Sequence, residues 1–291
     1  MNNKVELSII LPVFNEEGNI VSLLKEIDEA LCTRNISYEI VAVDDGSQDK
    51  SRDLLIEEYE KRSNLKVILF RKNFGQTAAF DAGFQYSSGD KIVTMDADGQ
   101  NDPADIPRML DELNRNYDFV AGWRKNRKDG TFSRNIPSKV ANYLIRRITK
   151  TKIKDLGCSL KLYRREITKD LHLYGEMHRF IGVLVEGLGA RVSQIEVNHR
   201  PRLMGVSKYN LNRTFKVVLD LITVWFLRSY QTKPIYVFGG AGLLTLGLSA
   251  ISLGVVAYQK FFNNIWVHKN PLFIIGMILG VVSIKFIDIG L

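Results

Sequence analysis

The sequence contains few cysteines and few prolines. Only 2 of its 291 residues are cysteine, Cys32 and Cys158, and 7 are proline. Two cysteines are too few for a disulfide scaffold or a cysteine-rich zinc module, which fits a reducing compartment. The low proline count, together with 45% hydrophobic residues, excludes a disordered chain and a collagen-like repeat. The length leaves room for one large domain and a smaller second unit.

Two common nucleotide-binding motifs are also absent from the sequence. It has no Gly-x-Gly-x-x-Gly segment and no Walker A loop, so a dinucleotide oxidoreductase and a P-loop NTPase are both poorly supported. No secretory signal is expected, because the apolar stretch at 7–14 is short and acidic residues follow it.

Positive charge is concentrated in one segment. The chain has a net charge of +8, and residues 124–165 hold fourteen Lys or Arg against two acids, which leaves the rest at −4. Such a block favours an anionic partner: a nucleic acid, anionic lipid headgroups or a phosphorylated substrate. A solvated surface is the alternative.

The C-terminal part contains two long apolar runs. Residues 234–258 carry no charge, and 25 residues suffice to cross a hydrocarbon core of roughly 30 Å. A linker at 259–270 leads to a second run at 271–291, interrupted by Lys285 and Asp288. We therefore expect a membrane domain at 233–291 with two transmembrane helices, and a buried core helix is the alternative.

The segment before these runs has a different pattern. Between 211 and 230, large apolar residues recur at spacings of three and four, with charged residues between them. This predicts amphipathic juxtamembrane helices at 209–232, with packing against the N-terminal domain as the alternative. Basic residues before the first run (Arg213, Lys216, Arg228, Lys233) predict that the domain at 1–208 stays in the cytoplasm.

The first 200 residues alternate between two patterns. Short apolar, β-rich runs predict strands at 6–13, 38–44, 65–70, 91–96 and 117–122, and helical periodicity predicts helices at 19–31, 51–62 and 76–87. This alternation predicts an α/β fold with a mostly parallel sheet and helices on both faces. In such sheets, ligands bind beyond the carboxyl ends of the strands.

Polar clusters follow these predicted strand ends. Asp96 and Asp98 end one strand, and their carboxylates suit Mg²⁺ or Mn²⁺ together with the oxygens of a diphosphate. Asp44 and Asp45 end another strand, and the alternative for both pairs is a turn or cap role. Asn15 follows the first strand, so three clusters are expected at one edge.

Further candidates lie in polar segments. Asn73, within Arg71–Asn73, offers an amide to a phosphate or a base, with a solvated surface as the alternative. Asp155 is an acid inside the basic block, where it suits an active-site carboxylate or a structural ion pair equally well. The basic residues of 199–209 are expected to meet phosphates at headgroup level.

Five segments, in this order, carry a resemblance to a known family: LPVFNE (11–16), VDDGS (43–47), MDADGQNDP (95–103), DLGCSLKLYRR (155–165) and HRPRLMGVSKY (199–209). Together they resemble the polyprenyl-phosphate glycosyltransferases, membrane relatives of dolichol-phosphate mannosyltransferase. The fourth segment is similar to the bacterial branch that loads undecaprenyl phosphate with aminoarabinose-type or glucosyl groups. The resemblance covers nearly the whole chain and implies a Rossmann-like GT-A-type domain of family 2.

The resemblance implies an inverting transfer from a nucleotide sugar to a lipid phosphate. It implies a metal ion, Mg²⁺ or Mn²⁺, on Asp96 and Asp98, with Asp98 and Asp155 as the catalytic residues. It assigns the donor to Pro12, Asn15, Glu16, Asp44, Asp45, Asn73, Asp96 and Gln100, and the acceptor phosphate to Arg202, Ser207 and Lys208. Many relatives have an acidic and an aromatic residue after the glycine of the Asp155 loop, whereas Cys158 and Ser159 stand here.

The expected partners follow from this resemblance. They are a UDP-sugar such as UDP-glucose in preference to a GDP-sugar, undecaprenyl or dolichyl phosphate, membrane lipids and a second copy of the chain in a homo-oligomer, with no nucleic acid. The expected location is the inner membrane of a cell that builds a glycosylated envelope. The alternatives are a processive polysaccharide synthase, which usually needs a Gln-x-x-Arg-Trp motif and more spans, and a non-catalytic nucleotide-binding subunit.

Overall fold

The computed structural model describes residues 5–34, 36–125, 151–171, 173–201 and 234–291. The chain divides into two compact units, Met1–Leu221 and Ile222–Leu291. The segment predicted to form amphipathic helices, 209–232, lies outside the described residues, and so does most of the basic block.

The N-terminal unit is built around one mixed sheet of seven strands in the order β3-β2-β1-β4-β6-β5-β7. Its strands are β1 (Leu7–Val13), β2 (Tyr38–Asp44), β3 (Leu65–Leu69), β4 (Lys91–Thr94), β5 (Phe119–Trp123), β6 (Lys161–Arg164) and β7 (Val192–Glu196). β1 is parallel to β2 and β4, whereas β6 runs antiparallel to β4 and β5. The sheet is therefore mostly parallel, as predicted, with one reversed strand in its interior.

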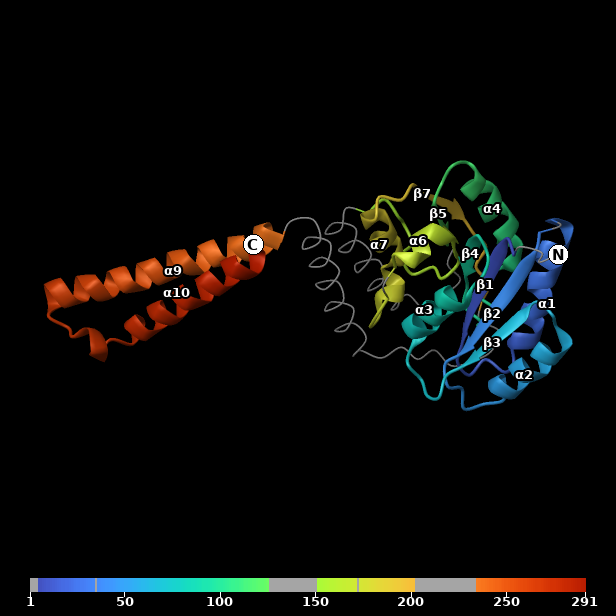
Figure 1. Ribbon diagram of the computed structural model, residues 1–291, viewed down its shortest axis with the longest axis horizontal. Helices are drawn as coiled ribbons and strands as arrows, with labels where there is room; N and C mark the ends of the chain where they lie inside the picture. The colour runs from blue at the N-terminus through green and yellow to red at the C-terminus, as the bar shows by residue number, and fades with distance from the viewer. Residues whose placement is uncertain (1–4, 35, 126–150, 172, 202–233) are drawn as a thin grey trace. The chain divides into compact units, whose positions relative to one another are not determined.

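Helices cover both faces of this sheet (Figure 1). They are α1 (Ile20–Leu31), α2 (Ser51–Lys61), α3 (Gln76–Tyr86), α4 (Ile106–Asn114), α6 (Arg165–Lys169) and α7 (Ile181–Gly187), with 3₁₀ turns η1 (Cys32–Arg34), η2 (Pro103–Asp105) and η3 (Met177–Arg179). Each strand and helix predicted within the first 200 residues is present, with its ends within two residues of the prediction. The α/β fold with helices on both faces is confirmed.

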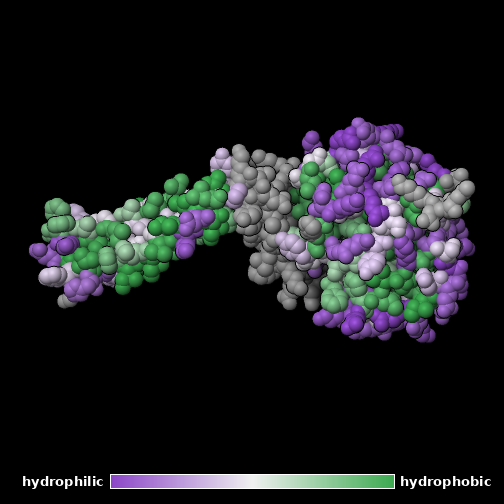
Figure 2. Space-filling model, viewed as in Figure 1, coloured by the Kyte–Doolittle hydropathy of each residue, from purple (hydrophilic) through white to green (hydrophobic). Residues whose placement is uncertain are grey.

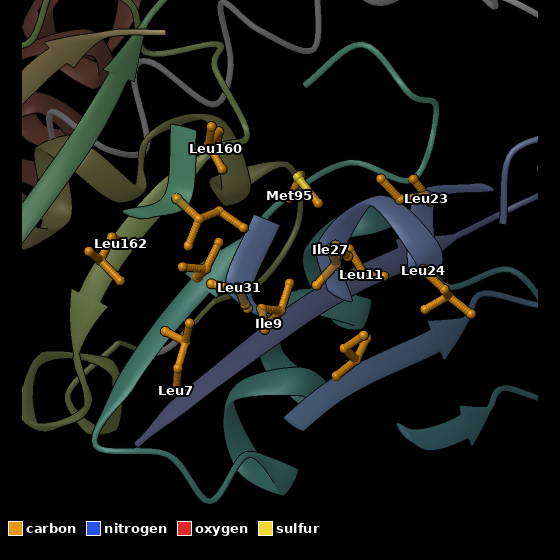
Figure 3. Packing of buried hydrophobic residues seen from close by; sticks show 14 of the residues in the cluster. Leu7, Ile9, Leu11, Leu23, Leu24, Ile27, Leu31, Met95, Leu160 and Leu162 are labelled. Carbon is orange, nitrogen blue, oxygen red and sulfur yellow. The ribbon is translucent and has the colours of Figure 1, made fainter. Parts of the chain in front are cut away.

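The main core lies between the sheet and the helices α1, α2 and α4. Side chains at alternate positions of β1 face it, among them Ile9 and Leu11, because successive strand residues point to opposite faces. α1 buries Ile20, Leu23, Leu24, Ile27 and Leu31, a spacing that places one apolar stripe on the strands (Figure 3). A smaller cluster on the other face joins β2 to Ala79 of α3.

The described part of the C-terminal unit, residues 234–291, contains the helices α9 (Pro234–Asn263) and α10 (Pro271–Gly290), joined through the 3₁₀ turn η4 (Val267–Lys269). Both are long and apolar enough to cross a membrane. Most of their large apolar side chains are exposed, and Figure 2 shows apolar residues over much of the visible face. Small and hydroxyl residues line their contact, where Ser249 donates to the Gly276 carbonyl (2.7 Å) and Ser283 to the Gly242 carbonyl (2.8 Å).

Candidate active site

The order of the strands places the topological switch point of the sheet at the carboxyl end of β1. The chain adds β2 and β3 on one side of β1 and then returns to add β4 on the other side, which is the switch point where such sheets bind ligands. Pairing between β1 and β4 stops at Ile10 and Thr94, while β1 continues beside β2 to Val13. Pro12 therefore lies where β1 has no paired strand on the β4 side. Because proline has no backbone N–H, this position costs no hydrogen bond between strands.

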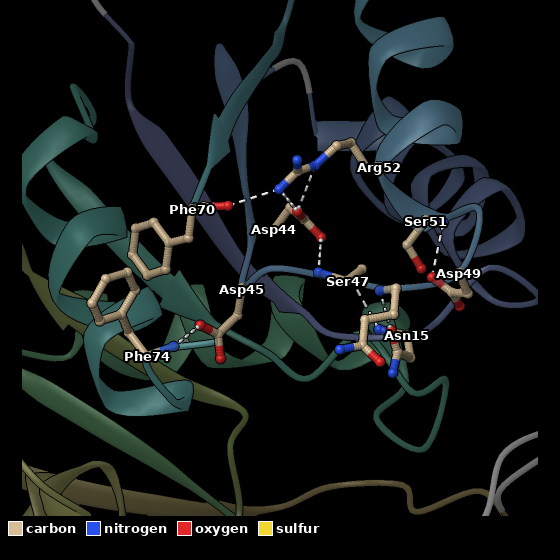
Figure 4. Close-up of polar contacts among 10 residues, drawn as sticks. Asn15, Asp44, Asp45, Ser47, Asp49, Ser51, Arg52, Phe70 and Phe74 are labelled. Atoms are coloured by element: carbon tan, nitrogen blue, oxygen red, sulfur yellow. Dashed lines mark hydrogen bonds and ion pairs between the residues drawn. The ribbon is translucent and has the colours of Figure 1, made fainter. Parts of the chain in front are cut away.

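The loops after β1 and β2 are tied to each other (Figure 4). Asn15 has a positive φ of 57°, which asparagine tolerates better than most residues. Its N–H donates to Ser47 Oγ (3.0 Å), and its side-chain Oδ1 accepts from the Gln48 N–H (2.8 Å). The Glu16 N–H donates to Ser51 Oγ (2.8 Å). These contacts join the two loops into one edge of the switch point.

Asp44 and Asp45 hold the loops at the same edge in place through hydrogen bonds. Asp44 has no exposed surface and accepts from the Arg52 guanidinium (3.0 and 3.1 Å) and the Ser47 N–H. Asp45 accepts from the N–H groups of Phe74 and Gly75 at the start of α3. Burial raises the pKa of Asp45, while these amides oppose the shift. The observed contacts match the turn role given as the alternative, and donor binding by these two carboxylates stays a prediction.

Asp96 and Asp98 lie in the loop after β4, as the sequence predicts. Asp96 is half-buried, and its Oδ1 accepts from Gln76 Nε2 (2.5 Å) at the first turn of α3. Asp98 is 6% exposed, and its Oδ1 accepts from the Gln100 N–H (3.1 Å). Burial and the adjacent Asp98 raise the pKa of Asp96.

The donor set at this loop fits a hard divalent cation. Among the described residues, no group of three or more His, Cys, Asp or Glu side chains is arranged to hold a metal ion. Two carboxylates are enough for Mg²⁺ or Mn²⁺ when substrate phosphates and water complete the shell. Asp96 and Asp98 are thus the residues that would hold such an ion.

Asp155 forms a buried ion pair with Arg124, which directly follows β5. Its Oδ2 accepts from Arg124 Nε (2.8 Å) and its Oδ1 from Nη2 (3.1 Å), and the two side chains are 7% and 10% exposed. Burial lowers the pKa of Arg124, but the bonds and charge of Asp155 raise it by more. A β-carbon at Gly157 would lie 3.3 Å from Arg124 Nη2, so this glycine lets the loop pack on the guanidinium. The structural ion pair given as an alternative for Asp155 is present.

The Asp155 loop is also fastened to the Asp96 loop. Ser159 Oγ accepts from the Asp96 N–H (3.3 Å) and from Asn101 Nδ2 (2.7 Å), and the Ser159 carbonyl accepts from Thr94 Oγ1 (2.8 Å). The reversed strand β6 follows this loop, so its pairing with β4 holds Asp155 and Arg124 beside Asp96. Sequence reasoning missed Arg124 and Ser159 as site residues, although Arg124 follows a predicted strand.

The remaining predicted residues have different environments. Asn73 is exposed on the loop that Asp45 holds, and Gln100 is partly exposed. Arg202, Ser207 and Lys208, predicted to handle the acceptor phosphate, lie outside the described residues. Arg200 donates to Glu26 (2.5 Å) and Asp102 (2.7 Å), which links the 199–201 segment to α1 and to the loop that follows Asp98. The predicted contact of the basic residues of 199–209 with headgroups stays a prediction.

Comparisons with known proteins agree with this geometry. The profile of Glycosyl transferase family 2 matches residues 8–172. The dodecaprenyl-phosphate galacturonate synthase of Rhizobium johnstonii is 42% identical over 99% of this chain and 86% of its own. The undecaprenyl-phosphate 4-deoxy-4-formamido-L-arabinose transferase of Klebsiella pneumoniae is 34% identical over 98% of this chain and 86% of its own.

Solved structures show the same fold at lower identity. Glucosyl-3-phosphoglycerate synthase from Mycobacterium tuberculosis, in complex with Mn²⁺, uridine diphosphate and phosphoglyceric acid, superposes with a TM-score of 0.60. The two chains are 18% identical, and the match covers 77% of this chain and 78% of that one. The same enzyme with Mn²⁺ and UDP-glucose gives a TM-score of 0.59 over 77% and 79%. The predicted GT-A-type fold is confirmed.

Proposed function

We propose that this chain, which belongs to glycosyl transferase family 2 and to its bacterial branch of polyprenyl-phosphate sugar transferases, moves one sugar from a nucleotide sugar to a polyprenyl phosphate. The observation that supports this proposal most directly is the loop at the switch point, where Asp96 and Asp98 lie beside the Arg124–Asp155 pair. Its support is the near full-length similarity to two enzymes named for such transfers.

The donor site, in this proposal, lies at the switch point beyond β1, β2 and β4. Pro12, Asn15, Glu16 and Asn73 line the donor edge, and Asp44 and Asp45 act chiefly by holding its loops. A Mg²⁺ or Mn²⁺ ion on Asp96 and Asp98 would neutralise the leaving diphosphate. We expect UDP as the nucleotide, because the solved structure with this fold binds UDP and UDP-glucose.

The reaction is a single displacement with inversion at the anomeric carbon. An oxygen of the acceptor phosphate forms the new bond to that carbon, while the bond to the nucleoside diphosphate breaks. A phosphate monoester has a second pKa near 6, so the attacking oxygen is already mostly anionic at neutral pH. The site therefore needs positioning more than proton removal, which agrees with an Asp155 that orients Arg124.

The acceptor side requires a membrane. The hydrophobic tail of a polyprenyl phosphate confines its phosphate to the headgroup plane, and α9 and α10 would hold the enzyme at that plane. We propose a multi-pass protein of the inner membrane with a cytoplasmic catalytic domain, where Arg202, Ser207 and Lys208 receive the acceptor phosphate. Self-association is part of the same proposal and remains a prediction.

A coupled assay tests this function. The purified full chain is incubated with Mn²⁺, undecaprenyl phosphate and, in turn, UDP-glucose, UDP-galacturonate and GDP-mannose, and release of the nucleoside diphosphate is measured. We expect release from at least one UDP-sugar that depends on the lipid phosphate. Release that is equal without the lipid, or that never occurs above the no-enzyme rate, would contradict transfer to this acceptor.

A further inference from the structure

Lys161 is a buried lysine that the proposed reaction does not use. It opens β6 and is 4% exposed. The antiparallel register places it opposite Thr94 of β4 and Ala121 of β5. Residues opposite each other in such a pair point to the same face of the sheet, and so do residues two apart along a strand. The side chain of Lys161 therefore lies on the face to which the continuation of β4 directs Asp96.

The ammonium group of Lys161 is poorly satisfied. Within the part of the chain that the structure describes, Nζ donates to the carbonyl of His178 at 3.5 Å, beyond the usual range for such bonds. An ammonium has three protons to donate. Among the ion pairs of the described residues, none includes Lys161, although Asp96, Asp155 and Arg124 are the charged groups around it. Burying a cation without a close partner is unfavourable.

Hydrogen bonds connect three elements around Lys161 and Asp96: the helix α3, the turn η3 and the strand β6. Gln76, at the first turn of α3, donates to Asp96 Oδ1 (2.5 Å). Next to it, Thr77 Oγ1 lies 2.8 Å from His178 Nδ1, which ties α3 to η3. The His178 carbonyl in turn accepts from Lys161. The turn η3 thus contacts both the ammonium of Lys161 and the helix α3, whose first turn holds Asp96.

A purely structural role explains this lysine badly. Replacing a buried charge by an apolar side chain of similar size is often neutral or stabilising. A lysine buried in this way has an unfavourable cost in stability that an anionic ligand would offset on binding.

We propose that Lys161 binds an anionic oxygen of the nucleotide-sugar donor. The inference rests on the proposed function, because it takes the switch point at Asp96 as the donor site. Two groups of a donor carry such oxygens: the diphosphate, and the carboxylate of an acidic sugar. The shared chemistry is a charge-assisted hydrogen bond from an ammonium to an anion.

Binding measurements test the inference without turnover. Full-length protein in detergent, as wild type, Lys161→Met and Lys161→Gln, is titrated calorimetrically with UDP, UDP-glucose and UDP-galacturonate in the presence of Mn²⁺. We expect both variants to lose about 10- to 100-fold in affinity, the range of one charge-assisted bond. An equal loss for all three ligands assigns the diphosphate, and a loss confined to UDP-galacturonate assigns the sugar carboxylate.

Thermal unfolding of the ligand-free proteins supplies the second readout. Lys161→Met is expected to unfold at the wild-type temperature or above it, because an unpaired buried charge has been removed. Lys25→Met is the control, since Lys25 forms an exposed i,i+4 pair with Glu29 on α1, and it should change neither stability nor affinity. A lower unfolding temperature of Lys161→Met combined with unchanged affinity for all three ligands would overturn the inference.

The same titrations separate this inference from the proposed function. If wild-type protein binds none of the three ligands, the donor class of the proposed function is wrong. If wild type binds them and both Lys161 variants bind equally well, the donor class stands and Lys161 has no part in holding it.

Discussion

Both carboxylate oxygens of Asp155 accept hydrogen bonds from Arg124. In the described structure, this carboxylate therefore orients the guanidinium of Arg124. Arg124 is 10% exposed, and the charge of Asp96 contributes to raising its pKa. A guanidinium fixed in this way presents its remaining N–H groups in a constant direction, which suits a phosphate. The pair thus acts as one unit, and its two members should show non-additive effects.

A double-mutant cycle tests the pair. We expect Asp155→Asn and Arg124→Gln each to lower kcat/KM by about 10- to 100-fold, and the double variant to be little worse than either single variant. The acidic limb of the pH profile should stay near 6 in wild type and in Asp155→Asn, because it reports the acceptor phosphate. Asp111→Asn, which breaks the exposed Arg34–Asp111 pair, is the control. A limb that disappears in Asp155→Asn would identify Asp155 as the base.

Asp98 supplies the second prediction for a single residue. We expect Asp98→Asn to reduce kcat at least about 100-fold and to abolish the effect of Mn²⁺ on the affinity for UDP, because a neutral amide is a weak ligand for a hard cation. Asp81→Asn removes a carboxylate of α3 that accepts from Gln85 (2.7 Å), and should leave both values unchanged. Calorimetry with and without Mn²⁺ gives the affinities. Mn²⁺-dependent UDP binding that survives in Asp98→Asn would contradict the metal assignment.

How far the sequence predicts the site differs from residue to residue. Asp96 and Asp98 were predicted because a polar pair directly after an apolar strand has a recognisable place in a parallel sheet. Arg124 and Lys161 were not, because one cation among fourteen in a basic segment carries no sign of its burial. Only the pairing of β6 between β4 and β5 brings these two side chains to Asp96.

Among the structural elements, the strands β6 and β7 were not predicted as strands, whereas their neighbour β5 was. β6 and β7 are five residues or fewer, and β6 was recognised only as part of a motif. Asp118, just before β5, joins them: it accepts from Arg191 before β7 (2.8 and 3.0 Å) and lies 3.6 Å from Arg164 of β6. One carboxylate thus fixes the ends of three strands that carry Arg124 and Lys161.

The pH dependence of stability tests this contact. The hydrogen bonds of Arg191 lower the pKa of Asp118 from 3.8 to about 2. Since the folded-state pKa lies below that of the unfolded chain, the stabilisation is complete above about pH 4 and is lost as the pH falls toward 2. We expect Asp118→Asn to cost about 1 kcal/mol of unfolding free energy at pH 7 and progressively less below pH 4. Urea unfolding at several pH values measures it; a difference that is constant down to pH 2.5 would contradict the account.

The α9–α10 pair offers a matched comparison of two glycines. A β-carbon at Gly242 would lie 2.8 Å from Ile287 and 3.2 Å from the Ser283 carbonyl, whereas one at Gly247 would meet nothing within 4 Å. We expect Gly242→Val to destabilise the helix pair by about 1–3 kcal/mol through overpacking, and Gly247→Val to be nearly neutral, although both lie on the same helix. Thermal unfolding in detergent measures the difference. Equal losses would show that the two helices do not pack as described.

For the whole molecule, the order of a large α/β unit followed by two apolar helices was predictable from hydropathy and alternation alone. The sequence pattern is enough for this prediction, because an uncharged run of 25 residues is long enough to span a membrane and is unusual in a soluble protein. The side of the membrane on which the large unit lies is a separate question, and a native cysteine answers it. Cys32 is exposed and Cys158 is buried, so one thiol of the catalytic unit is accessible.

Labelling with a membrane-impermeant maleimide tests the proposed cytoplasmic location. We expect Cys32 to react only after intact cells are permeabilised, and a Cys32→Ser variant to give no signal in either condition. Labelling of Cys32 in intact cells would place the catalytic unit outside.

The most direct test of the central claim is the mass of the lipid product. Undecaprenyl phosphate is incubated with the full-length enzyme, Mn²⁺ and the UDP-sugar that gives nucleotide release, and the lipid is analysed by mass spectrometry. We predict a gain of one sugar residue with a single phosphate retained, and no such product with Asp98→Asn. A lipid that gains a second phosphate, or that stays unmodified while UDP is released, would contradict transfer of a sugar to the carrier phosphate.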